Sequence, residues 1–334
     1  MDQSWADSPL ELTNQYLPQS YDLSLKLDHV KPNFQGQVRI PLVENSLYNG
    51  EANAPFCLSL HAHKLIVTSA QLQTTEGVSQ KLKVSYDRPH QRVVFSAEGV
   101  LSATEITVSF LGSVASIKTF HDETYGVFKT NYSDSVQGRS DNYVIATHAQ
   151  PFGCRSIFPV VDELTHKVPI SLSITTKSSF KVVSNAPLST ATIVDMTENS
   201  VFTFKPTPPI APSVFGFMIG DFEKIENISG ITPVCAYVTK GDSQYAQYAL
   251  KTAVSLLPVF ETVLGVKYPL EKLDIVALPF LSDAVMENWG MITVIKDALF
   301  LDETSASEEA KIPCQAVDFP SIDSSVDRKP CFRR

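Results

Sequence analysis

Short runs of alternating apolar and polar residues fill the first two thirds of the chain. The clearest runs span residues 21–27, 36–42, 81–86, 92–97, 105–112, 168–176 and 200–206. A period of two, with β-branched and aromatic residues between Gly, Pro, Asn and Asp, is typical of strands that bury one face. Many such strands predict a large sandwich or a curved open sheet. We therefore predict a mainly β domain over residues 17–222, preceded by an N-terminal extension over residues 1–16.

Longer periods and continuous apolar runs replace this pattern after residue 222. Residues 243–264 carry an apolar stripe at helical spacing, and Gly265 predicts the end of that helix. Residues 273–279 form a continuous apolar run, which is typical of a central strand. We therefore predict the start of an α/β domain over residues 223–304. Because this start lacks further helices to pack on, we expect its strand and helix to expose apolar faces.

The last part of the chain, residues 305–334, shows neither period. It contains three prolines and many polar residues. Because such a segment buries too little apolar surface to offset its loss of conformational entropy, we expect an unrelated, disordered tail.

Composition narrows the classes of partner. The 334 residues are 43% hydrophobic and 19% charged, as in soluble globular proteins. A formal net charge of -9 argues against nucleic acid, because phosphate binding needs clustered Lys and Arg. The chain has no apolar run of about 18 residues and no signal peptide, so we expect no membrane partner. Five scattered cysteines, an odd number, favour reduced thiols and a cytoplasmic location.

Residues 279–290 read PFLSDAVMENWG and carry the most specific motif of the chain. They resemble the substrate-binding loop of the aminopeptidase N type (gluzincin) zinc aminopeptidases, whose signature is G-A-M-E-N followed by W-G. Residues 125–132 are similar to the family's G-F/L-Y-R-S-x-Y block. Residues 147–163 are similar to its T-Q-x-E-P block, followed by A-R and F-P-C-x-D-E-P. Three blocks in the family's order make residues 12–304 similar to the N-terminal part of a divergent member.

The resemblance implies a saddle-like β domain followed by the α/β start of a thermolysin-like catalytic domain, which is incomplete here. It implies that Glu287 binds the free α-amine of a peptide, that Asn288 fixes the loop, and that Met286 lines the first side-chain pocket. A carboxylate and an ammonium form a charge-assisted hydrogen bond, which an internal peptide bond cannot offer. The alternative interpretation is a surface glutamate in an ordinary loop.

Four of the candidate site residues depart from the family pattern. Ala284 and Val285 replace Gly-Ala and crowd the approach of a peptide backbone. His148 replaces the Gln that also contacts the amine; a neutral imidazole accepts one hydrogen bond, whereas a protonated one repels an ammonium. Gln150 replaces a Glu and removes a negative charge. We therefore expect altered substrate specificity.

The zinc motif of this family, H-E-x-x-H, is absent from the sequence. The histidines stand at positions 29, 61, 63, 90, 121, 148 and 166, and no two have the i, i+4 spacing. His61 and His63 could share one face of a strand, but a zinc site needs at least three protein ligands. We interpret them as ordinary strand histidines. Zinc is the cofactor of the full-length family, but we expect this chain to bind none and to contribute no metal ligand and no catalytic residue.

These observations leave three hypotheses. The first is the N-terminal portion of a zinc metallo-aminopeptidase, which recognises peptides with a free N-terminus and is not itself catalytic. The second is a non-catalytic module that binds peptides or nascent chains, with the ribosome as an additional partner. The third is a β-rich interaction scaffold, in which Glu287 and Asn288 have no role.

Overall fold

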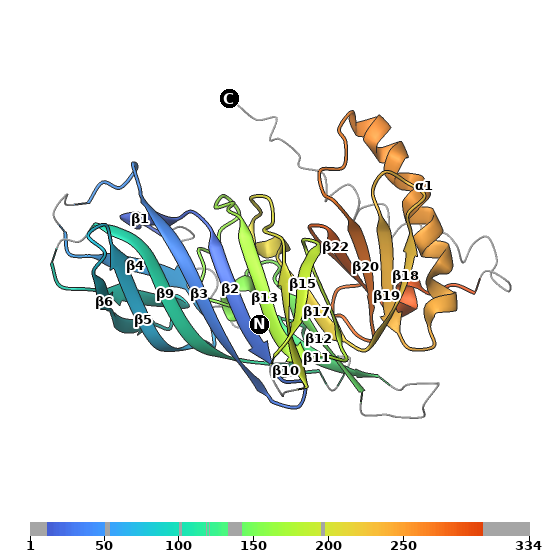
Figure 1. The fold of residues 1–334 in the computed structure, drawn as a ribbon, viewed down its shortest axis with the longest axis horizontal. Coiled ribbons are helices and arrows are strands. Elements are labelled where there is room, and N and C mark those ends of the chain that lie inside the picture. The colour runs from blue at the N-terminus through green and yellow to red at the C-terminus, as the bar shows by residue number, and fades with distance from the viewer. Residues whose placement is uncertain are drawn as a thin grey trace.

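A computed structural model describes residues 12–50, 54–99, 102–117, 119, 121–132, 142–194 and 198–302. Figure 1 shows a large body of strands followed by a smaller unit in which the long helix α1 lies beside a sheet. The predicted fold class, a mainly β part followed by an α/β part, is confirmed. We call the part up to β17, which ends at Gly220, the first unit, and the part from β18, which begins at Phe222, the second unit. The expected extension and tail fall largely outside the described residues.

A nine-stranded sheet dominates the first unit. Its strand order is β15-β16-β13-β2-β3-β9-β5-β6, with β1 paired to β3, and β13 runs parallel to β2. In β2 every second residue is buried, as the alternating pattern predicts. The strands of this sheet are β1 (Tyr16–Pro18), β2 (Tyr21–Leu27), β3 (Asn33–Glu44), β5 (Ile66–Thr74), β6 (Ser79–Lys81), β9 (Ala103–Ser113), β13 (Ile170–Lys177), β15 (Leu188–Ile193) and β16 (Asn199–Phe204).

Two smaller sheets complete the first unit. The three-stranded sheet, in the order β4-β8-β7, contributes Leu58 and Phe95 to a core shared with Leu23 and Val108 of the large sheet. A five-stranded sheet has the order β10-β11-β12-β17-β14. The elements are β4 (Cys57–His61), β7 (Lys83–Asp87), β8 (Arg92–Ser96), β10 (Ala115–Ser116), β11 (Gly126–Tyr132), β12 (Asn142–His148), β14 (Lys181–Ser184), β17 (Phe217–Gly220), and the 3-10 turns Cys154–Ser156 and Pro212–Val214.

The second unit contains a five-stranded sheet in the order β18-β19-β20-β22-β21. The expected helix forms as a 3-10 turn followed by α1, and it ends at Gly265, whose φ is 66°. This is the left-handed conformation that favours glycine at a helix C-terminus. The elements are β18 (Phe222–Asn227), β19 (Val234–Thr239), the 3-10 turn Ser243–Ala246, α1 (Gln247–Leu264), β20 (Leu273–Leu278), β21 (Val285–Asn288), β22 (Met291–Ile295) and α2 (Lys296–Leu299).

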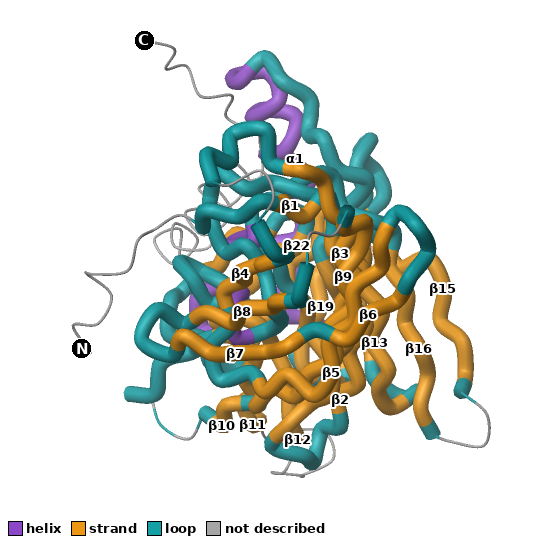
Figure 2. The backbone as a smooth tube through the Cα atoms, turned by 90° about the vertical axis from the view of Figure 1, so that its left-hand side faces the viewer, coloured by secondary structure: helices purple, strands orange, loops and turns teal. Residues whose placement is uncertain are grey.

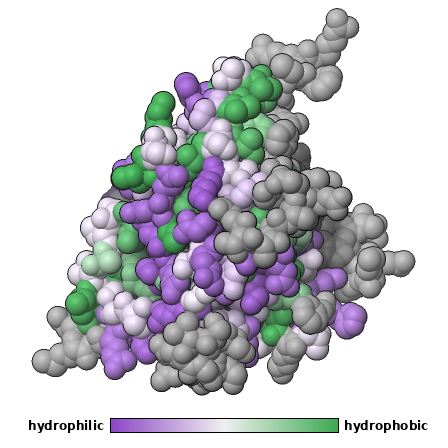
Figure 3. Space-filling model, turned by 90° about the vertical axis from the view of Figure 1, so that its right-hand side faces the viewer, coloured by the Kyte–Doolittle hydropathy of each residue, from purple (hydrophilic) through white to green (hydrophobic). Residues whose placement is uncertain are grey.

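Both faces of the second sheet are covered. Side chains of α1 pack on one face, and the five-stranded sheet of the first unit packs on the other. All six residues of β20 are buried, so the expectation that this strand exposes an apolar face is wrong, because the first unit supplies the missing cover. The outer side of α1 does expose Val259 and Val263. Figure 3 shows that side of the molecule, with separate hydrophobic patches among hydrophilic residues.

Candidate functional site

The candidate motif forms a hairpin. β21 and β22 pair antiparallel, with Glu287 opposite Ile292 and Asn288 opposite Met291. Trp289 and Gly290 make the turn, and Gly290 has a φ of 75°. The expectation of a loop over residues 279–290 is therefore wrong for its second half, because the two-residue turn lets Val285–Asn288 add to the edge of the sheet.

The turn of this hairpin is tied to the first unit through Asn185. The Asn185 side-chain amide donates to the carbonyls of Trp289, at 2.7 Å, and Val214, at 2.8 Å. The backbone N–H of Trp289 also donates to the Val214 carbonyl, at 3.3 Å. A Cβ on Gly290 would lie 2.4 Å from the Asn185 carbonyl oxygen, so only glycine fits this close approach. The candidate strand is thus positioned by both units.

An ion pair between the half-buried Lys272 and the buried Asp274 also holds this turn. The Lys272 ammonium donates to Asp274 Oδ2 at 2.6 Å, to the Gly290 carbonyl at 2.9 Å and to the Ser184 carbonyl at 2.5 Å. Burial raises the pKa of Asp274, and the Lys272 charge opposes that shift. Three acceptors saturate the three donors of the ammonium, so this lysine is engaged in holding the two units together.

Alternate residues of β21 face opposite sides of the strand. Met286 is 1% exposed and Asn288 is fully buried, and Met286 packs in the core shared with the first unit. Val285 packs against the α1 cluster on the other side, and the period of two places the half-buried Glu287 on that side as well. Pocket lining by Met286 therefore stays a prediction, since its thioether contacts the core.

Asn288 has an unusual environment. Its side-chain N and O atoms are both buried and have no hydrogen-bond partner among the described residues. Its Cγ lies 3.1 Å from the position that a Cβ on Gly216 would take. A buried amide without partners is costly, by about 1–3 kcal/mol. The role of Asn288 in fixing the loop stays a prediction, because no described hydrogen bond carries it.

His148 ends β12 and connects the first unit to the loop that leads into β21. The His148 Nδ1 atom lies 2.7 Å from Thr124 Oγ1, and its Nε2 atom lies 3.3 Å from Asp283 Oδ2. Thr124 Oγ1 in turn lies 2.6 Å from Ser282 Oγ. Thr124 and Ser282 are 158 residues apart in the sequence, so this cluster joins distant segments. Asp283 is the one exposed ionisable member of the cluster, with 66% of its side chain accessible.

The protonation state of His148 follows from these surroundings. Burial lowers the pKa of His148, and the Asp283 carboxylate opposes that shift. A neutral ring can donate from Nε2 to Asp283 and accept at Nδ1 from the Thr124 hydroxyl. Both ring nitrogens then have partners within this cluster. The contact of His148 with a peptide amine stays a prediction, and it requires one of these partners to be exchanged.

The remaining expected residues lie around these two features. Ala284 is exposed and precedes β21, and its carbonyl accepts from the Ile295 N–H at 2.9 Å. Gln150 is half-buried just beyond β12, before a cis peptide bond to Pro151. The hydrogen bonds described for this region do not connect the Gln150 side chain to β21.

Sequence reasoning missed the residues that position the hairpin. Asn185, Lys272, Thr124, Ser282 and Asp283 all contact segments far away in the chain. An Asn at the end of a strand is an ordinary turn signal. The sequence therefore offered no indication of their contacts.

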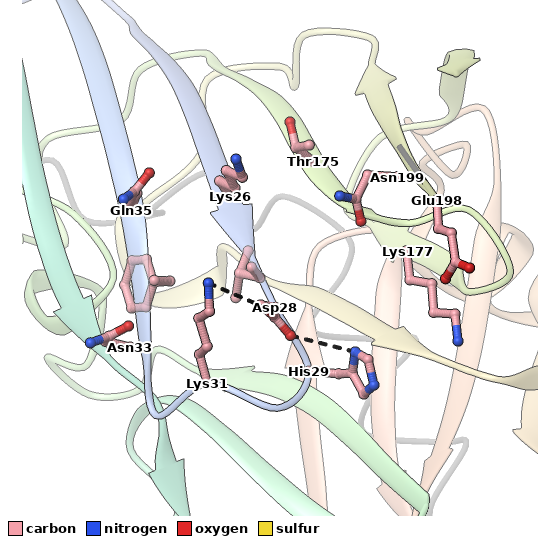
Figure 4. Close-up of a pocket in the computed structure, with 12 residues that line it drawn as sticks. Lys26, Asp28, His29, Lys31, Asn33, Gln35, Thr175, Lys177, Glu198 and Asn199 are labelled. Carbon is pink, nitrogen blue, oxygen red and sulfur yellow. Dashed lines mark ion pairs between the residues drawn. The ribbon is translucent and has the colours of Figure 1, made fainter. Parts of the chain in front are cut away.

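A polar hollow of the first unit lies away from these residues. Figure 4 shows a pocket of about 450 Å³ at the β2–β3 turn and the ends of β13 and β16, where Asp28 pairs with His29 and Lys31. Its residues all belong to the first unit, and the seven expected site residues are not among them. The lining residues include Lys26, Gln35, Thr175, Lys177, Glu198 and Asn199.

The described residues do not fit a zinc centre. They contain no group of three or more His, Cys, Asp or Glu side chains close enough to hold a metal ion. His148 has one carboxylate beside it, and a catalytic zinc needs three protein ligands. His61 is buried, and its Nδ1 accepts from the Asp162 N–H at 3.1 Å.

Each of the two units matches a known protein-family domain. Residues 17–213 match the Peptidase M1 N-terminal domain, and residues 248–317 match the Peptidase family M1 domain. The second match extends past residue 304, where the sequence alone led us to expect the family-like part to end. None of the described helices has the length and apolar character needed to cross a membrane.

Individual relatives agree with these matches. Protein TMA108 of Saccharomyces cerevisiae is 36% identical over 91% of this chain and 34% of its own length. The alanine/arginine aminopeptidase of the same yeast is 27% identical over 89% of this chain and 33% of its own length. Endoplasmic reticulum aminopeptidase 1 of Homo sapiens is 27% identical over 91% of this chain and 31% of its own length. The chain thus spans about a third of these relatives.

Proposed function

Because the chain belongs to the peptidase M1 family, we propose that it recognises the free α-amine of peptides through Glu287. One observation carries this proposal. Glu287 is a half-buried carboxylate on an edge strand whose turn is tied to the first unit by Asn185 and Lys272. The carboxylate is therefore both accessible and held in place, as the capture of a small cation requires.

The chemistry favours an ammonium ligand. A carboxylate at a partly dehydrated edge forms a stronger, charge-assisted hydrogen bond with an ammonium than with a neutral amide. Acetylation removes that charge, so an acetylated peptide leaves the carboxylate without compensation. Peptides with a free N-terminus are the proposed partners, and a nascent chain with an uncapped amine meets the same requirement.

We assign different roles to the neighbouring residues. Ala284 and Val285 narrow the approach to the backbone of β21, which favours short contacts with the first residue of the peptide. His148 and Asp283 hold the loop in front of β21 and place a second carboxylate near it. Gln150 adds no charge. Recognition without cleavage is the proposed activity of this chain, and peptide-bond hydrolysis is proposed for longer members of the family.

Binding of matched peptides tests this proposal. Calorimetric titration of the 334-residue chain with trialanine amide is expected to show saturable binding, and its N-acetylated form is expected not to bind. Glu287→Gln is expected to weaken binding about tenfold, which corresponds to about 1.4 kcal/mol. Glu223→Gln is the matched control, since Glu223 is also half-buried but lies on β18, at the opposite edge of the same sheet.

Three outcomes would contradict the proposal. Equal binding of the free and acetylated peptides would show that the amine is not recognised. Equal effects of Glu287→Gln and Glu223→Gln on binding would show that Glu287 does not contact the peptide amine. Zinc-dependent release of N-terminal residues by the purified chain would contradict recognition without cleavage.

A further inference from the structure

The edge strand β15 differs from the other strands of the large sheet. All six of its residues are exposed, so neither face of the strand rests on a core. Its partner within the described part of the chain is β16, which leaves the outer row of backbone N–H and C=O groups facing solvent. Figure 2 shows β15 as the outermost strand, beyond β16. Such an edge is a template for pairing with another strand.

Two other sheet edges carry features that disfavour pairing. The opposite edge of the same sheet is β6, which has three residues and ends in Lys81. The edge strand β18 of the second unit has the sequence FEKIEN, with three charged residues in six. In contrast, β15 reads LSTATI and has no charge. Charged side chains are a common protection of sheet edges, and β15 lacks them.

One irregularity limits where pairing can occur. The register between β15 and β16 shifts between Leu188 and Thr190, so Ser189 forms a bulge. From Thr190 to Ile193 the two strands pair residue by residue, from Thr190 opposite Thr203 to Ile193 opposite Ser200. The regular, neutral half of the edge is therefore Thr190–Ile193.

We propose that β15 pairs antiparallel with β15 of a second copy of this chain. A two-fold axis through Ala191 places Thr190 of one copy opposite Thr192 of the other, and the same pair forms twice. Thr–Thr pairs across antiparallel strands are favourable, and the small Ala191 side chain meets its own copy without crowding. A neutral strand offers no charge by which a different partner would be selected, and its own sequence satisfies the pairing on both sides.

The expected dimer is weak. A single pair of strands buries less than the roughly 1,200 Å² of a standard stable interface, so association is expected in the micromolar range or above. Each copy carries a formal charge of -9, so the copies repel one another and added salt is expected to strengthen the dimer.

Substitutions that introduce like or opposite charges on β15 test this pairing. Thr190 and Thr192 are exposed and lie on one side of the strand, so substitutions there leave the core untouched. Sedimentation velocity of the wild-type chain is expected to show a mass that rises with concentration from one copy of 36.8 kDa toward two. Thr190→Lys/Thr192→Lys and Thr190→Glu/Thr192→Glu are each expected to remain single copies. An equimolar mixture of the two variants is expected to dimerise, because opposite charges then face one another.

Ser85→Lys adds one lysine at an exposed position of the edge strand β7, away from β15, and is expected to leave the dimer unchanged. The proposal is overturned if the wild-type mass stays at one copy, or if both charged variants still dimerise. It is also overturned if their mixture remains single, or if wild-type association continues beyond two copies.

Discussion

The interior of the first unit and the contact between the two units use similar polar side chains in different surroundings. In the interior, Arg155 Nε donates to Asp162 Oδ2 at 3.0 Å, and both side chains are buried. At the contact between units, His148 meets Asp283, which is 66% exposed. A charge pair without access to water is costly to break, whereas an exposed one exchanges its partner for water. The Arg155–Asp162 pair therefore serves stability, whereas the His148–Asp283 contact can rearrange.

The largest expected effect breaks the interior pair. Asp162→Ala leaves the buried Arg155 guanidinium without its carboxylate, which is expected to cost about 3–5 kcal/mol of unfolding free energy. Asp283→Ala removes the exposed carboxylate and is expected to cost about 1 kcal/mol or less. Urea unfolding of both variants measures the difference. Equal losses would show that the two clusters do not differ as described.

A smaller effect is expected where the candidate hairpin meets the first unit. Gly290→Ala adds a Cβ 2.4 Å from the Asn185 carbonyl oxygen at a φ of 75°, so the turn must move. Gly77→Ala is the matched control, because Gly77 has a φ of 76° and nothing lies within 4 Å of its added Cβ. The positive φ costs about 1 kcal/mol at either position.

The difference between these two variants isolates the contact with Asn185. We expect Gly290→Ala to lose about 1–3 kcal/mol more than the control and to bind trialanine amide more weakly. Thermal unfolding and the same titration provide the two measurements. A Gly290→Ala chain that matches the Gly77→Ala chain in both would mean that the turn is not tied to the first unit.

Acidification is expected to affect the two buried histidines, His61 and His148, differently. Burial, together with the charges of Arg155 and Arg92, lowers the pKa of His61 to about 3. The unfolded chain binds a proton at this histidine below about pH 6.5, whereas the folded chain does not until about pH 3. Stability is therefore expected to fall as the pH falls through this window, by at most about 1.4 kcal/mol per pH unit.

His61→Asn removes this titration and keeps an acceptor for the Asp162 N–H. Urea unfolding between pH 7 and about pH 4 is expected to show a flatter profile for His61→Asn than for the wild type. The same comparison with His148→Asn is expected to give a smaller change, because Asp283 opposes the lowering of the His148 pKa. Identical profiles for all three chains would contradict the burial effect.

The alternation of apolar and polar residues predicted strands that bury one face. It did not predict β15, which is exposed on both faces, or β21, which is a short edge strand. The run at residues 21–27 coincides with β2 because its buried and exposed residues alternate. β15 gave no such pattern, since all of its residues are exposed. β21 was expected as a loop, because its four residues become a strand only by pairing with β22 across the Trp289–Gly290 turn. Local patterns cannot report a strand that is defined by its neighbours.

For the candidate site too, the sequence predicted local motifs but not contacts between distant segments. The motif of residues 279–290 and the family blocks carried the identity of the chain, and the M1 matches confirm that family. In the cluster around His148, Thr124 contacts Ser282 across 158 positions, and the hairpin turn contacts Asn185 across 104 positions. Local sequence cannot connect residues so far apart. The roles of Glu287, Asn288 and His148 toward a peptide remain predictions, which the titrations above address.

The shared core between the two units also has a consequence for the order in which the protein forms. Phe128, Val144 and Met218 of the first unit build one wall of this core, and Val276, Leu278 and Met291 of the second unit build the other. Synthesis proceeds from the N-terminus, and domains generally fold as units while the chain emerges. The first wall is therefore complete before β20 and β22 have been made. We therefore expect β20 and β22 to assemble on a surface of the first unit that has already formed.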